Sequence, residues 1–141
     1  MSHLVISCID GRIRGRLKEL EERLGENNPL WLLVPGGGLI FSESKAEADA
    51  VTGWLETLIS RQGVDRIILV SHQRCLAYGR KLGGFFFDER DTVTRDLAKA
   101  KNAIWDRFPG IGVDCFIVPW LDDNPDNGFG PAEEVIVPRT R

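Results

Sequence analysis

Long hydrophobic runs are absent from this sequence, and so is a large excess of charge of one sign. The longest apolar stretches, such as 30–34 and 67–70, fall far short of the roughly 20 residues that cross a bilayer, which argues against a membrane span. No cationic segment followed by an apolar stretch precedes Cys8, so we expect no secretory signal and a cytoplasmic location. The net charge of -3 lacks the basic excess typical of proteins that bind nucleic acid. Neither nucleic acid nor a membrane is an expected partner.

Cysteine is also scarce. Three cysteines in 141 residues cannot all pair within one chain and are too few for a disulfide scaffold, so we expect thiols kept for metal binding or chemistry. Apolar residues make up 43% of the chain, with four Trp and seven Phe, which suffices for one core. With no internal repeat, low-complexity segment or linker, residues 1–141 are expected to form a single domain.

Strand-like apolar runs alternate with segments of helical spacing. The strands are predicted at 4–6, 30–34, 66–70 and 115–118, with a short edge strand at 134–137 after a loop over 122–131. The predicted helices are 13–24 closed by Gly25, a second from the capping box Ser44-x-x-Glu47 to Gly63, and 93–108 closed by Pro109-Gly110. The second helix is expected to carry Val51, Trp54, Leu55, Leu58 and Ile59 on one face.

This alternation predicts an α/β fold, a three-layer sandwich around a mainly parallel sheet of four to five strands. Ligands of such sheets bind beyond the carboxyl ends of the strands. If the first and third strands are neighbours, the residues that follow them converge on one edge of the sheet.

Two clusters of potential metal ligands occupy these positions. Cys8-Ile9-Asp10-Gly11-Arg12 follows the first strand and His72-Gln73-Arg74-Cys75 follows the third. Cys8, His72 and Cys75 together offer two thiolates and one imidazole, which zinc prefers, and three protein ligands leave a fourth position open. Cys115, in the middle of a predicted strand, is expected to be buried core.

Asp10 and Arg12 are spaced to pair as carboxylate and guanidinium. The pair would hold Asp10 ionised and oriented. Asp10 then either accepts the proton of zinc-bound water or itself fills the fourth position.

Three glycines, Gly36, Gly37 and Gly38, follow the second strand. Their successive N–H groups would suit an anion nest for bicarbonate. A plain strand-to-helix turn is the alternative.

CIDGR and HQRC resemble the double motif of the β-class carbonic anhydrases, Cys-x-Asp-x-Arg after the first strand and His-x-x-Cys after the third. The resemblance runs from about residue 4 to residue 79. It implies that Cys8, His72 and Cys75 hold Zn²⁺ and that Asp10 and Arg12 form the catalytic dyad. It further implies a homodimer and reversible hydration of carbon dioxide to bicarbonate by zinc-bound hydroxide.

The sequence departs from that family in several places. Gly11 stands where Ser is usual, and Val34-Pro35-Gly36-Gly37-Gly38 replaces an Arg-Asn-Ala-Gly type segment. Cys8 lies close to the start, without the N-terminal helical arm of family members. A dimer is therefore expected to use another surface, for which the run Phe85-Phe86-Phe87 is the candidate.

Three alternative functions fit the same residues. Relatives of this family hydrolyse carbon disulfide or carbonyl sulfide on such a zinc site. The segment from Cys8 to Arg14 also reads Cys-x5-Arg between strand and helix, the arrangement of cysteine-based phosphatases. The phosphatase interpretation gives His72 and Cys75 no role. The residue after Arg14 is Gly15, where such phosphatases usually have Ser or Thr. The third alternative is a zinc-stabilised domain that binds a partner without catalysis.

Overall fold

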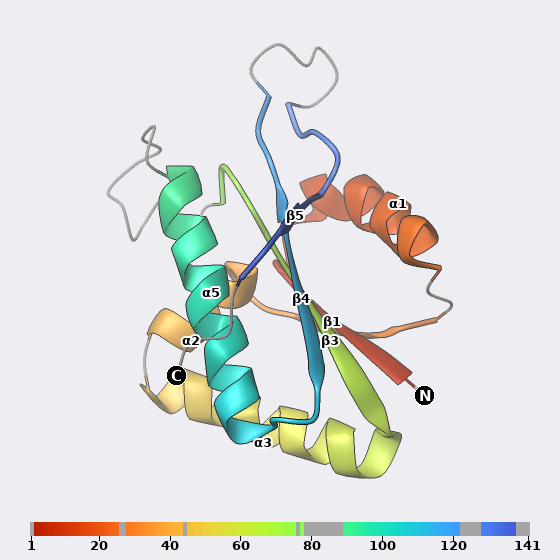
Figure 1. The fold of residues 1–141 in the computed structure, drawn as a ribbon. Coiled ribbons are helices and arrows are strands. Elements are labelled where there is room, and N and C mark those ends of the chain that lie inside the picture. The colour runs from red at the N-terminus through yellow and green to blue at the C-terminus, as the bar shows by residue number, and fades with distance from the viewer. Residues whose placement is uncertain are drawn as a thin grey trace.

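The fold is built around one five-stranded sheet with helices on both faces (Figure 1). The structure is a computed structural model that describes residues 2–25, 28–43, 45–75, 77, 89–121 and 128–137. The strand order is β2-β1-β3-β4-β5. The strands are β1 Ser2–Ser7, β2 Leu30–Leu33, β3 Val64–His72, β4 Gly112–Val118 and β5 Glu133–Val135.

The first four strands are parallel and β5 pairs with β4 in the antiparallel direction. This confirms the predicted α/β class and mainly parallel sheet. The parallel pairing places Leu4 opposite both Leu30 and Ile67. The carboxyl ends of β1 and β3 therefore lie side by side, as the converging clusters require.

Helices follow β1, β2 and β3 in the chain and lead to the next strand. They are the 3-10 turns η1 Gly11–Ile13 and η2 Gly37–Leu39 and the α-helices α1 Arg14–Leu24, α2 Ile40–Glu43, α3 Lys45–Gln62 and α5 Glu89–Arg107. Gly25 after α1 and Gly63 after α3 both adopt positive φ, 70° and 67°, a conformation that glycine adopts without strain. The predicted ends of both helices are confirmed. Ser44 and the run 85–87 lie outside the described residues.

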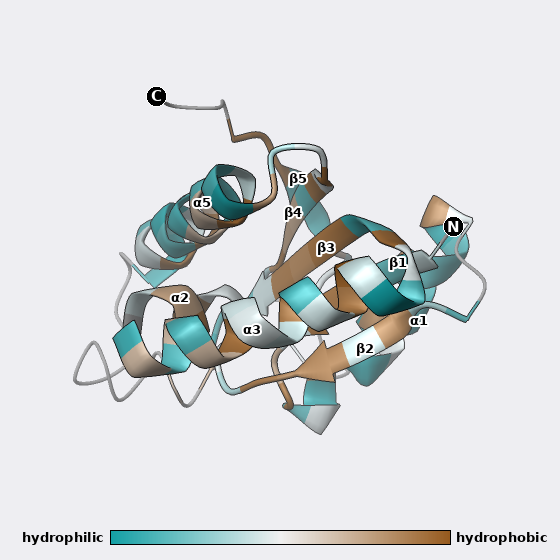
Figure 2. Ribbon diagram, turned by 90° about the horizontal axis from the view of Figure 1, so that it is seen from below, coloured by the Kyte–Doolittle hydropathy of each residue, from teal (hydrophilic) through white to brown (hydrophobic). Residues whose placement is uncertain are grey.

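The core lies on both sides of the central strands, which are apolar in their middle parts, at 4–6 in β1 and 67–70 in β3 (Figure 2). Leu4, Ile6, Ile67 and Leu69 are completely buried. Along a strand, successive side chains point to opposite faces, so a strand buried on both faces reads as a continuous apolar run. β1 and β3 have this pattern.

Trp54 departs from the predicted buried face of the second helix. Its side chain is 64% exposed, whereas Val51 and Leu55 are buried. Helical spacing places Trp54 next to Leu55, and only the residues turned most directly toward the sheet are covered. The prediction was therefore wrong for Trp54.

Replacing Trp54 by Gln is expected to change the free energy of unfolding by no more than about 0.5 kcal/mol, as for an exposed site. Leu55→Ala, one position on, should cost about 2–5 kcal/mol because it leaves a cavity in the core. Denaturant unfolding followed by circular dichroism measures both. A larger loss for Trp54→Gln than for Leu55→Ala would contradict the burial described above.

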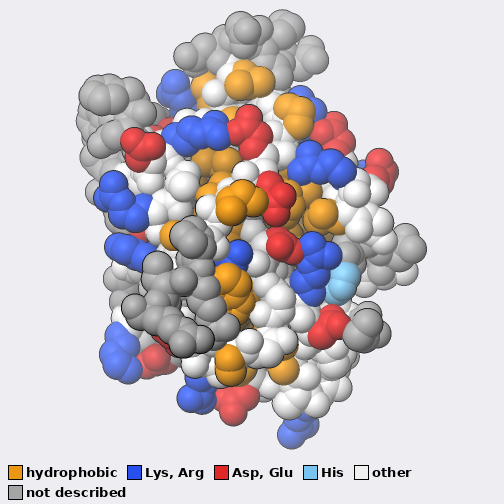
Figure 3. Space-filling model, in the orientation of Figure 1, with side chains coloured by type: hydrophobic (Ala, Val, Ile, Leu, Met, Phe, Trp, Pro, Cys, Tyr) orange, Lys and Arg blue, Asp and Glu red, His pale blue; other side chains and the backbone are white. Residues whose placement is uncertain are grey.

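Acidic and basic side chains are interspersed over the face shown in Figure 3. Oppositely charged side chains of the described residues also form pairs, as in Arg66–Asp114 (Nε to Oδ2, 2.6 Å) and Arg107–Glu56 (3.3 Å). Exposed pairs of this kind each contribute little to stability. Within the described ranges, no helix is both long and apolar enough to cross a membrane.

Candidate metal centre

The two clusters predicted to hold a metal meet at the carboxyl ends of β1 and β3. Ser7, the last residue of β1, pairs with Val70 of β3, so Cys8 follows one strand where His72 ends the other. Cys75 lies three residues further on, after a turn in which Arg74 has a φ of 56°. The sheet therefore brings together residues that are 64 or more positions apart in the sequence.

The potential ligand atoms of Cys8, His72 and Cys75 all lie within 4.8 Å of one another, and all three residues are buried. The two sulfur atoms are 3.7 Å apart, too far for a disulfide. Two sulfurs bound at about 2.3 Å to one tetrahedral ion would be about 3.8 Å apart. The spacing of the thiols thus fits a shared zinc ion.

His72 presents one nitrogen to this cluster. Its Nδ1 lies 2.6 Å from the carbonyl oxygen of Gln73, and a carbonyl only accepts, so Nδ1 carries the proton. Its Nε2 is buried and has no hydrogen-bond partner among the described residues. A buried polar atom without a partner is costly, and this nitrogen has its lone pair free for a metal, as in other metal-binding histidines.

The surroundings of Cys8 favour the thiolate. The backbone N–H of Gly36 donates to its sulfur over 3.4 Å. The pKa of the Cys8 thiol is lowered to about 4, chiefly by the hydrogen bond from Cys75. Burial raises this pKa, and smaller effects of His72 and the Asp10 backbone lower it. The thiolate is the form that binds metals.

Cys115, the third cysteine, is buried in β4 away from this cluster. Its thiol lies 3.8 Å from the carbonyl oxygen of Leu97, and burial raises its pKa to about 12. The expectation of a core cysteine is confirmed.

Asp10 and Arg12 form the predicted pair. Arg12 donates from Nε to both carboxylate oxygens, at 3.1 and 3.0 Å, from its terminal nitrogen at 2.7 Å and from its backbone N–H at 2.9 Å. These bonds lower the pKa of Asp10. The same guanidinium donates to the carbonyl oxygen of Arg74 over 2.8 Å. Asp10 Oδ2 lies 3.7 Å from His72 Nε2, so the carboxylate is both fixed and next to the cluster.

Glu89 is a functional candidate that the sequence did not reveal. It begins α5, is buried, and its carboxylate accepts the backbone N–H of Arg74. Burial raises its pKa, against the backbone hydrogen bonds from Arg74 and Cys75. It thereby supports the turn that positions Cys75.

Phe129 forms an aromatic wall at the centre and was also missed. It is completely buried. Its ring packs edge-on against the rings of His72 and Trp120, with centroids 5.5 Å and 5.1 Å apart. The Arg12 guanidinium lies over the same ring, 5.3 Å from its centroid. Arg16 holds the segment in place with two hydrogen bonds to the Phe129 carbonyl oxygen, at 3.1 and 2.9 Å. The wall fixes both the imidazole and the dyad.

The N–H groups of the three glycines all have acceptors within the protein. Gly36 donates to Cys8 Sγ, Gly37 to the carbonyl oxygen of Val34 at 3.2 Å, and Gly38 to Ser71 Oγ at 3.1 Å. An anion bound there would have to replace these bonds. The geometry therefore favours the alternative of a tight strand-to-helix turn that supports Cys8.

Gly37→Ala is expected to lower the free energy of unfolding by about 2–4 kcal/mol. Gly37 has a φ of 59°, and an added Cβ would collide with the Val70 carbonyl oxygen. Gly53→Ala is the matched control, because nothing lies within 4 Å of its Cβ position in helix α3, and it should stabilise by about 0.5–1 kcal/mol. Urea unfolding compares the two, and equal effects would contradict the tight packing of the turn.

The Cys-x5-Arg interpretation needs loop N–H groups that are free to cradle an oxyanion. Here the N–H of Arg12 binds the Asp10 carboxylate and that of Ile13 binds the Asp10 carbonyl oxygen at 3.4 Å. The loop is closed on itself as η1, and the geometry favours the metal-site interpretation.

The fold and this site define an α/β protein with a Cys-His-Cys group able to hold a metal. No family model matches the sequence, and no curated protein matches it either. Among solved structures, the fold is similar to that of β-carbonic anhydrases, and at these identities the likeness concerns the fold alone.

Three such structures illustrate the likeness. The enzyme of the fungal pathogen Aspergillus fumigatus has a TM-score of 0.50 and 14% identity over 94% of this chain and 74% of its own. Isoform I of the protozoan Trichomonas vaginalis has a TM-score of 0.47 and 16% identity, over 96% of this chain and 82% of its own. A structure from work on two tetrameric enzymes of the ascomycete Sordaria macrospora has a TM-score of 0.49 and 17% identity, over 95% of this chain and 80% of its own.

Proposed function

We propose that this chain binds one zinc ion through Cys8, His72 and Cys75 and catalyses the reversible hydration of carbon dioxide to bicarbonate. The observation that carries the proposal is the buried cluster of two thiols and an imidazole nitrogen without a hydrogen-bond partner among the described residues. This donor set suits zinc. When bound, zinc acidifies a water ligand and so supplies a nucleophile near neutral pH.

Asp10 has the role of proton acceptor in this proposal. Its carboxylate accepts a hydrogen bond from a water that approaches the cluster and orients that water toward carbon dioxide. Arg12 keeps the carboxylate ionised and fixed through its paired hydrogen bonds. Because both oxygens of Asp10 are held by Arg12, a bound zinc ion would keep its fourth position for water, and this supports an open site rather than one closed by Asp10.

Phe129 and Glu89 act as positioning residues. Phe129 packs against the ring of His72 and covers the guanidinium of Arg12, which restricts the orientation of both. Glu89 holds the backbone of the turn before Cys75. Removing residues that hold metal ligands in place commonly changes metal affinity or activity by about 10- to 100-fold.

Stopped-flow hydration of carbon dioxide by the zinc-loaded protein tests the proposal. Activity above the buffer rate is expected, with loss on chelation and recovery when zinc is returned. A fully zinc-loaded protein that is inactive at both neutral and alkaline pH would contradict the enzyme and favour a zinc-stabilised binding domain.

The same preparation should be offered carbonyl sulfide and carbon disulfide, since hydrolysis of these molecules would use the same residues. The relative kcat/KM values identify the substrate. The homodimer stays a prediction, for which multi-angle light scattering is the measurement.

A further inference from the structure

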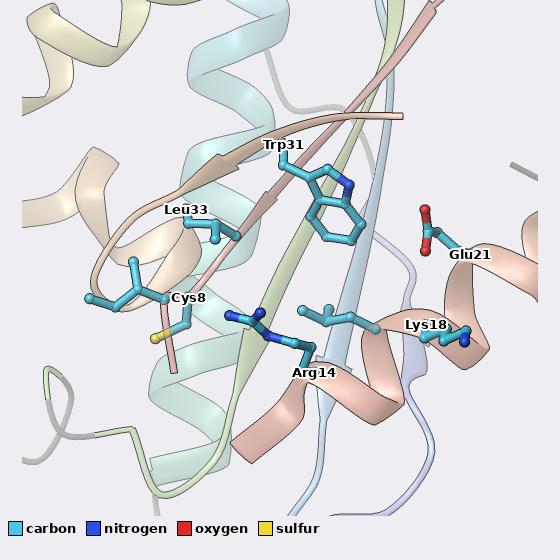
Figure 4. Close-up of a pocket in the computed structure, with 8 residues that line it drawn as sticks. Cys8, Arg14, Lys18, Glu21, Trp31 and Leu33 are labelled. Atoms are coloured by element: carbon cyan, nitrogen blue, oxygen red, sulfur yellow. The ribbon is translucent and has the colours of Figure 1, made fainter. Parts of the chain in front are cut away.

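A second candidate site lies between α1 and the edge strand β2. It is a cavity of about 370 Å³, within the size range of small-molecule sites. Figure 4 shows Trp31 and Leu33 of β2 on one side and Arg14, Lys18 and Glu21 of α1 on the other. The cavity thus has an apolar wall facing a charged one.

The apolar wall follows from the position of β2 at the edge of the sheet. Residues two apart share a face of a strand, so Trp31 and Leu33 point to the same side and are 41% and 43% exposed. Ile9, which also lines the cavity, is 54% exposed. Exposed apolar surface that gathers in one place marks a binding site more often than scattered residues do.

The charged wall is unusual for a helix face turned toward a sheet. Arg14, Leu17, Lys18 and Glu21 have the spacing i, i+3, i+4, i+7 that places side chains on one face, and of these only Leu17 is buried. A helix normally turns apolar residues toward a sheet. Here three charged residues face an apolar strand.

Arg14 and Lys18 have no ion-pair partner in the part of the chain that the structure describes. The neighbouring arginines are occupied: Arg12 binds Asp10, and Arg16 binds Glu19 at 3.0 Å. With Glu21 as the one carboxylate, the Arg14, Lys18 and Glu21 side chains of α1 together carry a net charge of +1. The amino end of α1 adds a partial positive charge near Arg14.

We propose that this cavity binds a small organic monocarboxylate with a flat apolar body. The cavity is much larger than a bare inorganic anion requires, and the walls of Trp31 and Leu33 offer apolar contact for the remainder. A guanidinium forms paired hydrogen bonds with a carboxylate, and in Figure 4 the Arg14 side chain extends along the cavity toward Cys8. One guanidinium suits a monoanion, since the N–H groups of the preceding turn are already in use.

The site is separate from the chemistry proposed for the metal centre. Cys8 lines the cavity, but in Figure 4 its sulfur points away from Arg14 and Trp31. Binding is therefore expected in the metal-free protein as well as in the zinc-loaded one, and it does not depend on carbonic anhydrase activity.

Isothermal titration calorimetry of the metal-free full chain with benzoate, phenylacetate and cinnamate tests the proposal. Saturable binding of one molecule per chain is expected for at least one of them, and its neutral amide should bind at least about tenfold more weakly. Arg14→Gln should weaken binding by about 10- to 100-fold through loss of a charged hydrogen bond. Arg14→Gln should retain zinc binding.

Two further variants complete the test. Arg61→Gln removes an exposed charge in the last turn of α3 and should leave binding unchanged. Leu33→Trp fills the cavity without removing a charge and should abolish binding. The proposal is overturned if none of the three acids binds, if Arg14→Gln or the neutral amide binds as well as the reference, or if binding requires zinc. It is also overturned if a dimer covers Trp31 and excludes the acids.

Discussion

Replacement of His72 by Ala is expected to weaken zinc binding by at least about 100-fold, since loss of a direct ligand should exceed the roughly 10- to 100-fold effect of losing a residue that only orients a ligand. Cys75→Ser should have a comparable effect, because a hydroxyl does not supply the thiolate that zinc prefers. The wild-type chain should hold one zinc ion. Elemental analysis of protein dialysed against zinc-free buffer, followed by competition with a chromophoric chelator, measures stoichiometry and affinity.

Cys115→Ala is the matched control for loss of a thiol. Cys115 is buried like the other two cysteines, but its sulfur contacts the Leu97 carbonyl oxygen in the core. The variant should keep a full equivalent of zinc even if it is somewhat less stable. Full zinc retention in both His72→Ala and Cys75→Ser, or equal loss in Cys115→Ala, would remove the basis of the metal site.

The convergence of the two clusters was predictable because it depends on backbone topology. Continuous apolar runs such as 67–70 indicate strands buried on both faces, and helices between them imply parallel neighbours. The adjacency of β1 and β3 then places Cys8 beside His72. The adjacency itself was a condition of the prediction, and the observed strand order meets that condition.

The supporting residues were not predictable, because their roles depend on where distant segments run. Phe129 lies in a part of the chain rich in Asp, Asn, Gly and Pro, whose composition indicates a loop but not the path that brings the ring to His72. Glu89 is buried at the start of α5 by its contact with the turn at Arg74. A buried carboxylate of this kind has the same local sequence signal as an exposed one.

The glycines and Trp54 show a similar limit. The run 36–38 indicates freedom of the backbone, but whether its N–H groups are available depends on acceptors such as Ser71 Oγ from another strand. The periodicity of α3 correctly indicates a helix with an apolar side. How much of that side is covered depends on the orientation of α3 on the sheet, which left Trp54 exposed.

Asp10→Asn is expected to lower kcat/KM for carbon dioxide hydration by about 100- to 1000-fold, in the range for loss of a general base, while leaving the zinc content unchanged. The amide has nearly the same shape but no charge and accepts a proton poorly. Arg12→Lys should cause a smaller loss, because the charge remains and the paired geometry does not. Stopped-flow kinetics and zinc analysis on the same samples give both quantities.

Asp49→Asn is the matched control, because Asp49 forms an exposed pair with Lys45 at 2.9 Å, far along the sequence from the clusters, and its loss should change neither quantity. The two readouts also distinguish the two roles proposed for Asp10. If Asp10 acts on water beside the metal, Asp10→Asn loses activity and keeps zinc. If Asp10 fills the fourth position, the same variant loses zinc affinity and opens the site to water. The four hydrogen bonds from Arg12 favour the first result, because a carboxylate held on both oxygens must break them before it can bind the ion.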